Sequence, residues 1–148
     1  MFTKNPLLEE TPHAWADKIL NNFNMFLLNH SACERKAAAL AMSFVVKYPN
    51  RKAVVEPMIS LAREELEHFQ QVFRLICQRG LVLPDKDEKD LYVNQILQKL
   101  RHGRDERFLD RLLMSALIEA RGHERFKILS ERLEDPFLKD FYKKLAIS

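Results

Sequence analysis

The sequence predicts an all-α protein built as a four-helix bundle. Residues that favour helices, namely Ala, Leu, Glu, Lys and Arg, are abundant, and the 148 residues include only 3 Gly and 6 Pro. Apolar residues recur with the period of a helix over long stretches, and no stretch of useful length alternates with the period of a strand. Hydrophobic residues make up 47% of the chain and charged residues 30%, which is typical of a soluble globular protein. We therefore expect residues 1–148 to form a single domain.

The first half of the chain predicts two long helices. Thr11-Pro12 is a typical helix start, with a hydroxyl cap followed by proline at the first helical position. The helical pattern then continues to Tyr48, with a break near residues 21–22. A second helix is expected over about residues 51–79, and Gly80 is expected to end it.

The second half predicts a crossover followed by two more helices. Residues 81–90 form the clearest loop, and a short amphipathic helix is expected over roughly residues 90–100. A third long helix is expected over about residues 105–133. Asp135-Pro136 opens a fourth, which is still helical in pattern where the sequence stops at Ser148. Long antiparallel helices with one extended crossover between helices 2 and 3 indicate a ferritin-like bundle, here with a short or truncated fourth helix.

Composition excludes several other classes of protein. No apolar run approaches the length of about 18 to 20 residues that a membrane span needs, and the N-terminus lacks the pattern of a secretory signal. The two cysteines, Cys33 and Cys77, are too few for a disulfide framework or a thiolate metal site. We interpret them as reduced thiols of a cytoplasmic protein. The net charge of +3 permits a nucleic-acid partner without arguing for one.

The acidic residues of the second helix do not all share one face. On a wheel of about 100° per residue, Glu65 lies in the middle of the apolar arc and His68 lies at its edge. Glu64 and Glu67 fall on the opposite side, where solvent is expected. The run REELEH therefore directs one carboxylate and one imidazole toward the core.

Two other helices also direct an acid inward. Glu34 shares its face with small and apolar residues such as Ala38 and Ala41, whereas its sequence neighbours point away. In the third long helix, Glu119 shares its face with leucines and phenylalanines, while Glu124 falls about 140° away on a partly exposed flank. Three helices thus each present one inward carboxylate.

Converging buried carboxylates indicate a metal centre. A buried ionised carboxylate without a partner costs several kcal/mol or more, so three of them require a strong positive charge. Oxygen ligands with an imidazole suit iron or manganese, and Glu-x-x-His places both side chains on one helical face. The separation of Glu34 and Glu65 lets the chain ascend one helix, turn and return to the same level. A lone Glu-x-x-His is more often a solvated face, and an inward Glu can pair with Arg, but no Arg lies centrally on these arcs.

Three segments resemble a known family in the same order along the chain: HSACERKAAALA (30–41), LAREELEHF (61–69) and ALIEARGHERF (116–126). They are similar to the tRNA hydroxylases that act on 2-methylthio-N6-isopentenyladenosine, which are cytoplasmic, ferritin-like, non-haem di-iron monooxygenases. The resemblance implies an oxidoreductase of tRNA modification that hydroxylates the isopentenyl group next to the anticodon. It also implies two iron ions, dioxygen and an external reductase. By carry-over, Glu34, Glu65, His68 and Glu119 are the expected iron ligands, and no catalytic residue is assigned beyond them.

The sequence departs from the family at one point. Such enzymes use a second Glu-x-x-His on the fourth helix, and this chain ends with KKLAIS about where that motif would begin. We therefore expect one iron to be held well and the other poorly. His123 shares the face of Glu119, and we interpret it as a supporting or core residue rather than a substitute ligand.

The densest basic segment is RHGRDER at residues 101–107, with Arg111 one turn beyond it. Binding of an anticodon loop requires cations for its phosphates, so the candidate tRNA contacts are Arg101, Arg104, Arg107 and Arg111. Such a run is more often a solvated face. Two other hypotheses stay open: a ferritin-like iron-binding or peroxide-handling protein without a nucleic-acid substrate, and a metal-free helical module in which the acids are relics.

Overall fold

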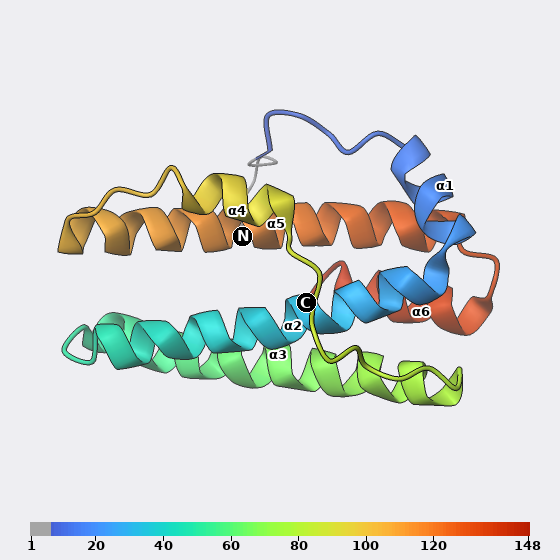
Figure 1. Cartoon of the computed structure of the whole chain (residues 1–148), viewed down its shortest axis with the longest axis horizontal. Helices are drawn as coiled ribbons and strands as arrows, with labels where there is room; N and C mark the ends of the chain where they lie inside the picture. Colours follow the sequence, from blue (N-terminus) through green and yellow to red (C-terminus); the bar gives the residue numbers. More distant parts are fainter. Residues whose placement is uncertain (1–6) are drawn as a thin grey trace. The chain divides into compact units, whose positions relative to one another are not determined.

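The computed structural model describes residues 7–148, and every regular element in that range is a helix (Figure 1). The helices are α1 (Ala14–Asn21), α2 (Phe23–Lys47), α3 (Lys52–Gln78), α4 (Leu91–Leu97), α5 (Arg104–Arg132) and α6 (Pro136–Leu145). The all-α prediction is therefore confirmed, with the expected break at Asn22 and the expected loop before α4. None of the described helices is long and apolar enough to cross a membrane.

The chain forms two compact units. One consists of Asn22–Glu88 and contains α2 and α3, which lie side by side and run in opposite directions (Figure 1). The other combines Met1–Asn21 with Lys89–Ser148 and contains α1, α4, α5 and α6. The expectation of a single domain over residues 1–148 stays a prediction.

The α2–α3 hairpin is built around a stripe of buried apolar side chains. Leu27 and Phe44 on α2, and Val72 and Ile76 on α3, are almost completely buried. Burial of such side chains stabilises a fold by roughly 1.5–3 kcal/mol each. The stripe recurs at the helical spacing that the sequence predicts, so it fixes which face of each helix points inward.

A glycine ends α3 as expected. Gly80 has a φ of 68°, in the left-handed region that favours glycine. The N–H of Leu81 donates to the carbonyl of Ile76 at 3.0 Å, and the N–H of Gly80 donates to the carbonyl of Cys77 at 3.0 Å. These two bonds form a Schellman motif, which stops the helix and redirects the chain into the crossover loop.

In the second unit, α6 packs against α5. Leu129 and Tyr142 are fully buried, and the rings of Phe126 and Tyr142 lie 5.5 Å apart. Asp135 caps α6 by accepting a hydrogen bond from the N–H of Leu138 at 3.0 Å, and proline occupies the first helical position. This start agrees with the sequence prediction, and α6 ends at Leu145.

The prediction of a helix start at Thr11-Pro12 is wrong, because α1 begins at Ala14. Thr11 instead bonds across the unit to α5. Its N–H and its hydroxyl donate to the two carboxylate oxygens of Glu124, at 2.9 and 2.6 Å. Arg121 donates to the same carboxylate at 2.7 Å and to the carbonyl of Glu9 at 2.8 Å. The Thr11 hydroxyl, which the sequence predicts to cap a helix, therefore donates its hydrogen bond to the carboxylate of Glu124.

These bonds make the stability of this unit depend on pH. Burial works to raise the pKa of Glu124, but the hydrogen bonds from Thr11 and Arg121 outweigh it, and the pKa lies below its ordinary value. A lowered pKa contributes stability above the unfolded-state value of about 4.3, and that stability is lost as the pH falls through the folded-state value.

We expect Glu124→Gln to lower the free energy of unfolding at pH 7 by about 1–3 kcal/mol, because charged hydrogen bonds are lost. The difference from wild type should shrink as the pH falls below about 4. Urea unfolding at several pH values measures both effects. Glu131→Gln, at an exposed position of α5, is the control. Equal behaviour of the two variants at every pH would contradict the assigned role of Glu124.

Candidate metal centre

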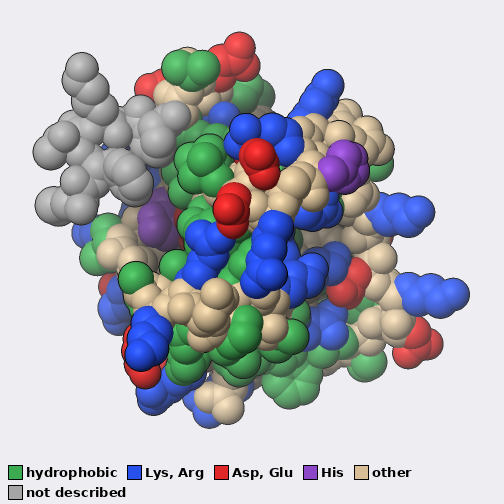
Figure 2. Space-filling view, turned by 90° about the vertical axis from the view of Figure 1, so that its left-hand side faces the viewer, with side chains coloured by type: hydrophobic (Ala, Val, Ile, Leu, Met, Phe, Trp, Pro, Cys, Tyr) green, Lys and Arg blue, Asp and Glu red, His purple; other side chains and the backbone are tan. Residues whose placement is uncertain are grey.

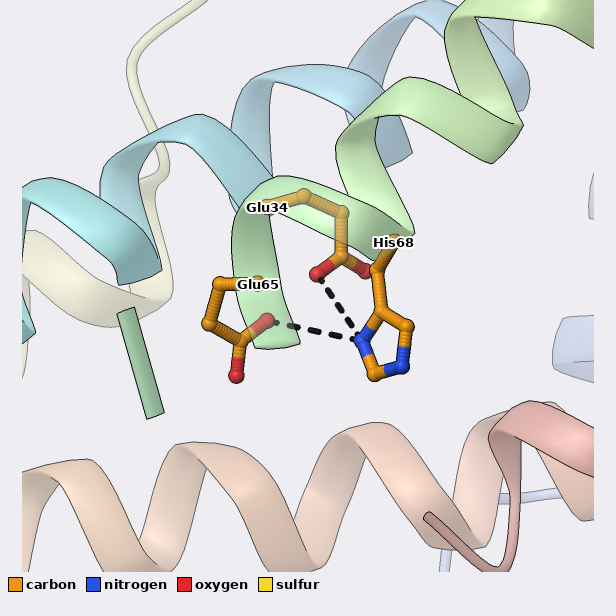
Figure 3. Close-up of side chains that lie close together, drawn as sticks. All are labelled: Glu34, Glu65 and His68. Carbon is orange, nitrogen blue, oxygen red and sulfur yellow. Dashed lines mark ion pairs between the residues drawn. The ribbon is translucent and has the colours of Figure 1, made fainter. Parts of the chain in front are cut away.

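Three of the predicted ligands meet in the α2–α3 hairpin. Glu34 comes from α2, and Glu65 and His68 come from α3. One oxygen of each carboxylate and one ring nitrogen of His68 all lie within 4.8 Å of one another. The Nδ1 atom of His68 is 3.9 Å from Oε2 of Glu34 and 3.7 Å from Oε2 of Glu65 (Figure 3). The side chains point toward one another and can place their donor atoms around one ion.

The helical spacing of the hairpin explains this convergence. Glu65 and His68 are three residues apart, so their side chains lie on one face of α3 about one turn apart. Glu34 is 7% exposed and Glu65 is 5% exposed, whereas Glu64 and Glu67 are exposed to solvent. The wheel prediction for these four acids is therefore confirmed.

Hydrogen bonds shift the pKa values of Glu34 and His68 toward their charged forms. Burial works to raise the pKa of Glu34, but the hydrogen bond and attraction of His30, with contributions from Glu65 and His68, outweigh it and lower the pKa. The hydrogen bond with Glu65 raises the pKa of His68, against the effect of burial, and the neighbouring carboxylates add to the rise. These directions favour an ionised Glu34 carboxylate and a protonated His68 imidazole beside each other in the hairpin.

The donor set fits a metal ion. Two neighbouring carboxylates repel when both are ionised, and a divalent cation between them would replace this repulsion with attraction. Two hard oxygen donors and one imidazole are a combination that suits iron or manganese. The residues present therefore fit the group that the sequence predicts, and Glu34, Glu65 and His68 are the candidate ligands.

The fourth predicted ligand lies elsewhere in the chain. Glu119 is on α5, in the second compact unit, and its side chain is 40% exposed. Its Oε2 atom is 3.7 Å from Nε2 of His123, one turn further along the helix. The structure brings Glu34, Glu65 and His68 together, and the role of Glu119 stays a prediction.

The sequence reasoning missed His30. This histidine is buried, and its Nε2 atom lies 2.6 Å from Oε1 of Glu34. The helical wheel identifies acidic residues that face inward, and it does not test whether a histidine one turn earlier contacts them. The usable signal is the spacing of four residues between His30 and Glu34, which brings two side chains together on a helix.

Arg35 on α2 forms an ion pair with the crossover loop next to the candidate ligands Glu34 and His68. It donates through Nη2 to Oδ1 of Asp87 at 2.7 Å, and its guanidinium lies 5.6 Å from the ring centre of Phe69. Lys36 adds a second, longer ion pair with Asp87 at 3.7 Å. Arg35 follows Glu34 and Phe69 follows His68 in the sequence, so the loop is held close to both ligand-bearing turns.

The basic segment at residues 101–107 differs from the expectation in one respect. Arg104 is exposed and Arg107 is half-buried, but Arg111 is buried, so it is not a surface cation. Its position one turn before the buried Met114 places it on the inward stripe of α5. Arg101 makes a two-pronged ion pair with Asp110, which lowers the pKa of Asp110 to about 2.

Comparison with known proteins shows to which family the chain belongs. The model of the family described as tRNA-(MS[2]IO[6]A)-hydroxylase (MiaE) matches residues 2–148. The chain is 36% identical over 125 residues to the tRNA 2-(methylsulfanyl)-N(6)-isopentenyladenosine(37) hydroxylase of Pseudomonas putida, covering 84% of this chain and 60% of that protein. It is 26% identical to the Salmonella typhimurium protein of the same name, covering 93% of this chain and 68% of the relative.

A solved structure gives the same result for the fold. A Synechococcus protein with aldehyde deformylating oxygenase activity matches with a TM-score of 0.90 and 37% identity, over 95% of this chain and 69% of the other. This likeness confirms the ferritin-like helical fold that the sequence predicts. The chain spans 60% of the length of the Pseudomonas relative. With a family match over nearly its whole length, the chain belongs to the MiaE family of tRNA hydroxylases.

Proposed function

We propose that the protein is a non-haem di-iron monooxygenase that hydroxylates the isopentenyl group of 2-methylthio-N6-isopentenyladenosine next to the anticodon of tRNA. The observation that carries the proposal is the group formed by the buried Glu34 and Glu65 and the half-buried His68, in a chain of this family. The names of the Pseudomonas and Salmonella relatives support the choice of substrate. Since its substrate is tRNA, we propose the cytoplasm as its location.

The proposed site uses carboxylates and an imidazole to hold iron. Glu34, Glu65 and His68 bind the first ion, and we propose Glu119 as a further ligand on its sequence position. Bound iron supplies the activation of dioxygen, with electrons from an external reductase. The hairpin itself buries the site, which excludes water from the reacting groups. It also places the small side chains of Ala38 and Ala41 on the same face of α2 as Glu34.

For the tRNA partner we propose contacts through the exposed part of the basic segment. Lys and Arg side chains are prominent on the face that Figure 2 shows, interspersed with acidic and hydrophobic ones. Arg104 and Arg107 are the candidates for phosphate contacts in residues 101–107. Arg101 is also accessible, with a side chain 56% exposed, although Asp110 already accepts its hydrogen bonds.

The test of the proposed activity is a reaction with defined components. Protein reconstituted with ferrous iron is given dioxygen, a reductant and tRNA that carries the modified adenosine. The expected result is that the modified nucleoside gains one oxygen atom, detected by mass spectrometry after digestion. An iron-loaded protein that leaves the nucleoside unchanged would contradict the proposal.

We expect Arg104→Glu combined with Arg107→Glu to weaken tRNA binding by at least about tenfold at low salt, because two phosphate contacts become repulsive. The slope of log affinity against log salt concentration should also fall by about two. Filter binding over a salt series measures both quantities. Arg63→Glu at an exposed position of α3, combined with Arg74→Glu on the same helix, gives a matched change of charge. Equal losses in the two double variants would show that only net charge matters.

The Synechococcus structure supplies a second candidate function. That protein has aldehyde deformylating oxygenase activity and is 37% identical to this chain. An aldehyde therefore serves as the rival substrate in the same reconstituted reaction. Turnover of the aldehyde with no change in the tRNA would favour this second function.

A further inference from the structure

We propose that His30 is a positioning residue: it holds one oxygen of Glu34 so that the other oxygen faces the metal. The inference rests on the proposed metal centre and adds a residue that the expected ligand set does not contain. His30 lies outside the group of donor atoms formed by Glu34, Glu65 and His68.

The contact between His30 and Glu34 is short and buried. The Nε2 atom of His30 lies 2.6 Å from Oε1 of Glu34, and the whole histidine is 4% exposed. An ionised carboxylate only accepts hydrogen bonds, so the imidazole nitrogen must be the donor. Hydrogen bonds to a charged group are shorter and stronger than those between neutral groups, and the short distance here agrees with a bond to an ionised carboxylate.

The two oxygens of Glu34 therefore have different partners. Oε1 accepts from His30 on α2, while Oε2 lies 3.9 Å from Nδ1 of His68 on α3. A hydrogen bond to one oxygen fixes the rotation of the carboxylate group. Oε2 is then presented to the space that His68 and Glu65 also face (Figure 3).

His30 is itself held in place, which a positioning residue requires. Its ring stacks on Phe26, one turn earlier on α2, with the ring centres 5.7 Å apart and an angle of 30° between the planes. A Glu side chain loses rotational freedom when it is fixed, at a cost of about 1–2 kcal/mol. Because the fold already fixes Glu34, a metal that binds does not have to order this side chain.

The test uses His30→Ala, His30→Gln and a control from the same turn. Glutamine can donate a hydrogen bond from an amide nitrogen at a position similar to Nε2, so it should restore the contact. The control is Ser31→Ala, since Ser31 is fully buried and its hydroxyl donates to the carbonyl of Leu28. Thermal unfolding of each metal-free variant checks its fold. If His30→Ala does not fold, His30→Leu, whose larger side chain likewise cannot donate a hydrogen bond, takes its place in the comparison with His30→Gln.

The measurements are anaerobic titrations with Fe²⁺ and with Co²⁺ as a spectroscopic probe. We expect His30→Ala to bind the first ion about 10–100-fold more weakly, which is the usual effect of losing a partner of a metal ligand. The visible Co²⁺ bands should also shift. His30→Gln should regain most of the affinity, and Ser31→Ala should match wild type.

Two results would overturn the inference while the metal centre stands. One is His30→Ala with wild-type affinity and spectrum. The other is His30→Gln that binds as weakly as His30→Ala, which would exclude a hydrogen-bond donor as the function of the imidazole. If wild-type protein itself binds neither ion, the proposed metal centre fails instead, and the inference fails with it.

Discussion

Glu65→Ala is expected to abolish iron binding at the α2–α3 cluster. The change removes one of two buried carboxylates and leaves Glu34 and His68 as the donors on this hairpin. We expect affinity for the first ion to fall by more than about 100-fold, beyond the range found for partners of ligands. Iron per chain after anaerobic reconstitution and desalting measures the loss. Hydroxylation of tRNA should disappear with the iron.

The matched control for this variant is Glu64→Ala. Glu64 precedes Glu65 on α3, but its side chain is exposed, so iron content should equal that of wild type. A ligand that binds only the folded state also raises the melting temperature, so added metal should stabilise wild type and Glu64→Ala but not Glu65→Ala. Unchanged iron content in Glu65→Ala would reject the ligand assignment.

Phe44→Ala is expected to lower the free energy of unfolding by about 3–5 kcal/mol, because it leaves a cavity where a large side chain was buried. Phe44 is 1% exposed and lies on the inward stripe of α2, with its ring 6.2 Å from that of Tyr48. Urea unfolding followed by circular dichroism measures the change. Such a loss is a large part of the stability of an ordinary domain.

Val46→Ala is the control for the core variant. Val46 is two residues further along α2 and is 75% exposed, so its truncation should change the free energy of unfolding by no more than about 0.5 kcal/mol. If Phe44→Ala is as mild as Val46→Ala, the hairpin core described above is not the one that stabilises the protein in solution.

Much of the fold, and the three candidate ligands on the α2–α3 hairpin, can be predicted from the helical period of the apolar residues. The helices α2, α3 and α5 agree with the sequence prediction to within a few residues, because long amphipathic segments carry many repeats of the pattern. The same period separates the buried Glu65 from the exposed Glu64. Glu34 and Glu65 can be found this way because a polar residue on a core-facing stripe is easily recognised. On α5 the same method is wrong about which acid is less exposed: the side chain of Glu119 is 40% exposed and that of Glu124 only 15%.

Two of the errors depend on tertiary structure, because local chemistry does not identify a distant partner or a buried position. A hydroxyl at Thr11 suits a helix cap as well as it suits a carboxylate, and only folding brings Glu124 to it. Arg111 belongs to a basic run in the sequence, yet its helical position buries it. His30 is a different case, because its partner Glu34 is only four residues away and the helical spacing itself predicts the contact.

The α2–α3 hairpin has a consequence for biosynthesis. Its three donors lie within residues 34–68, on two consecutive helices joined by a short turn. A helical hairpin depends on contacts between residues close in sequence, and such pairings form quickly. A ribosome that synthesises the chain therefore completes these donors before it translates any residue of α5, so the hairpin that carries them can form while α5 and α6 are still to be synthesised.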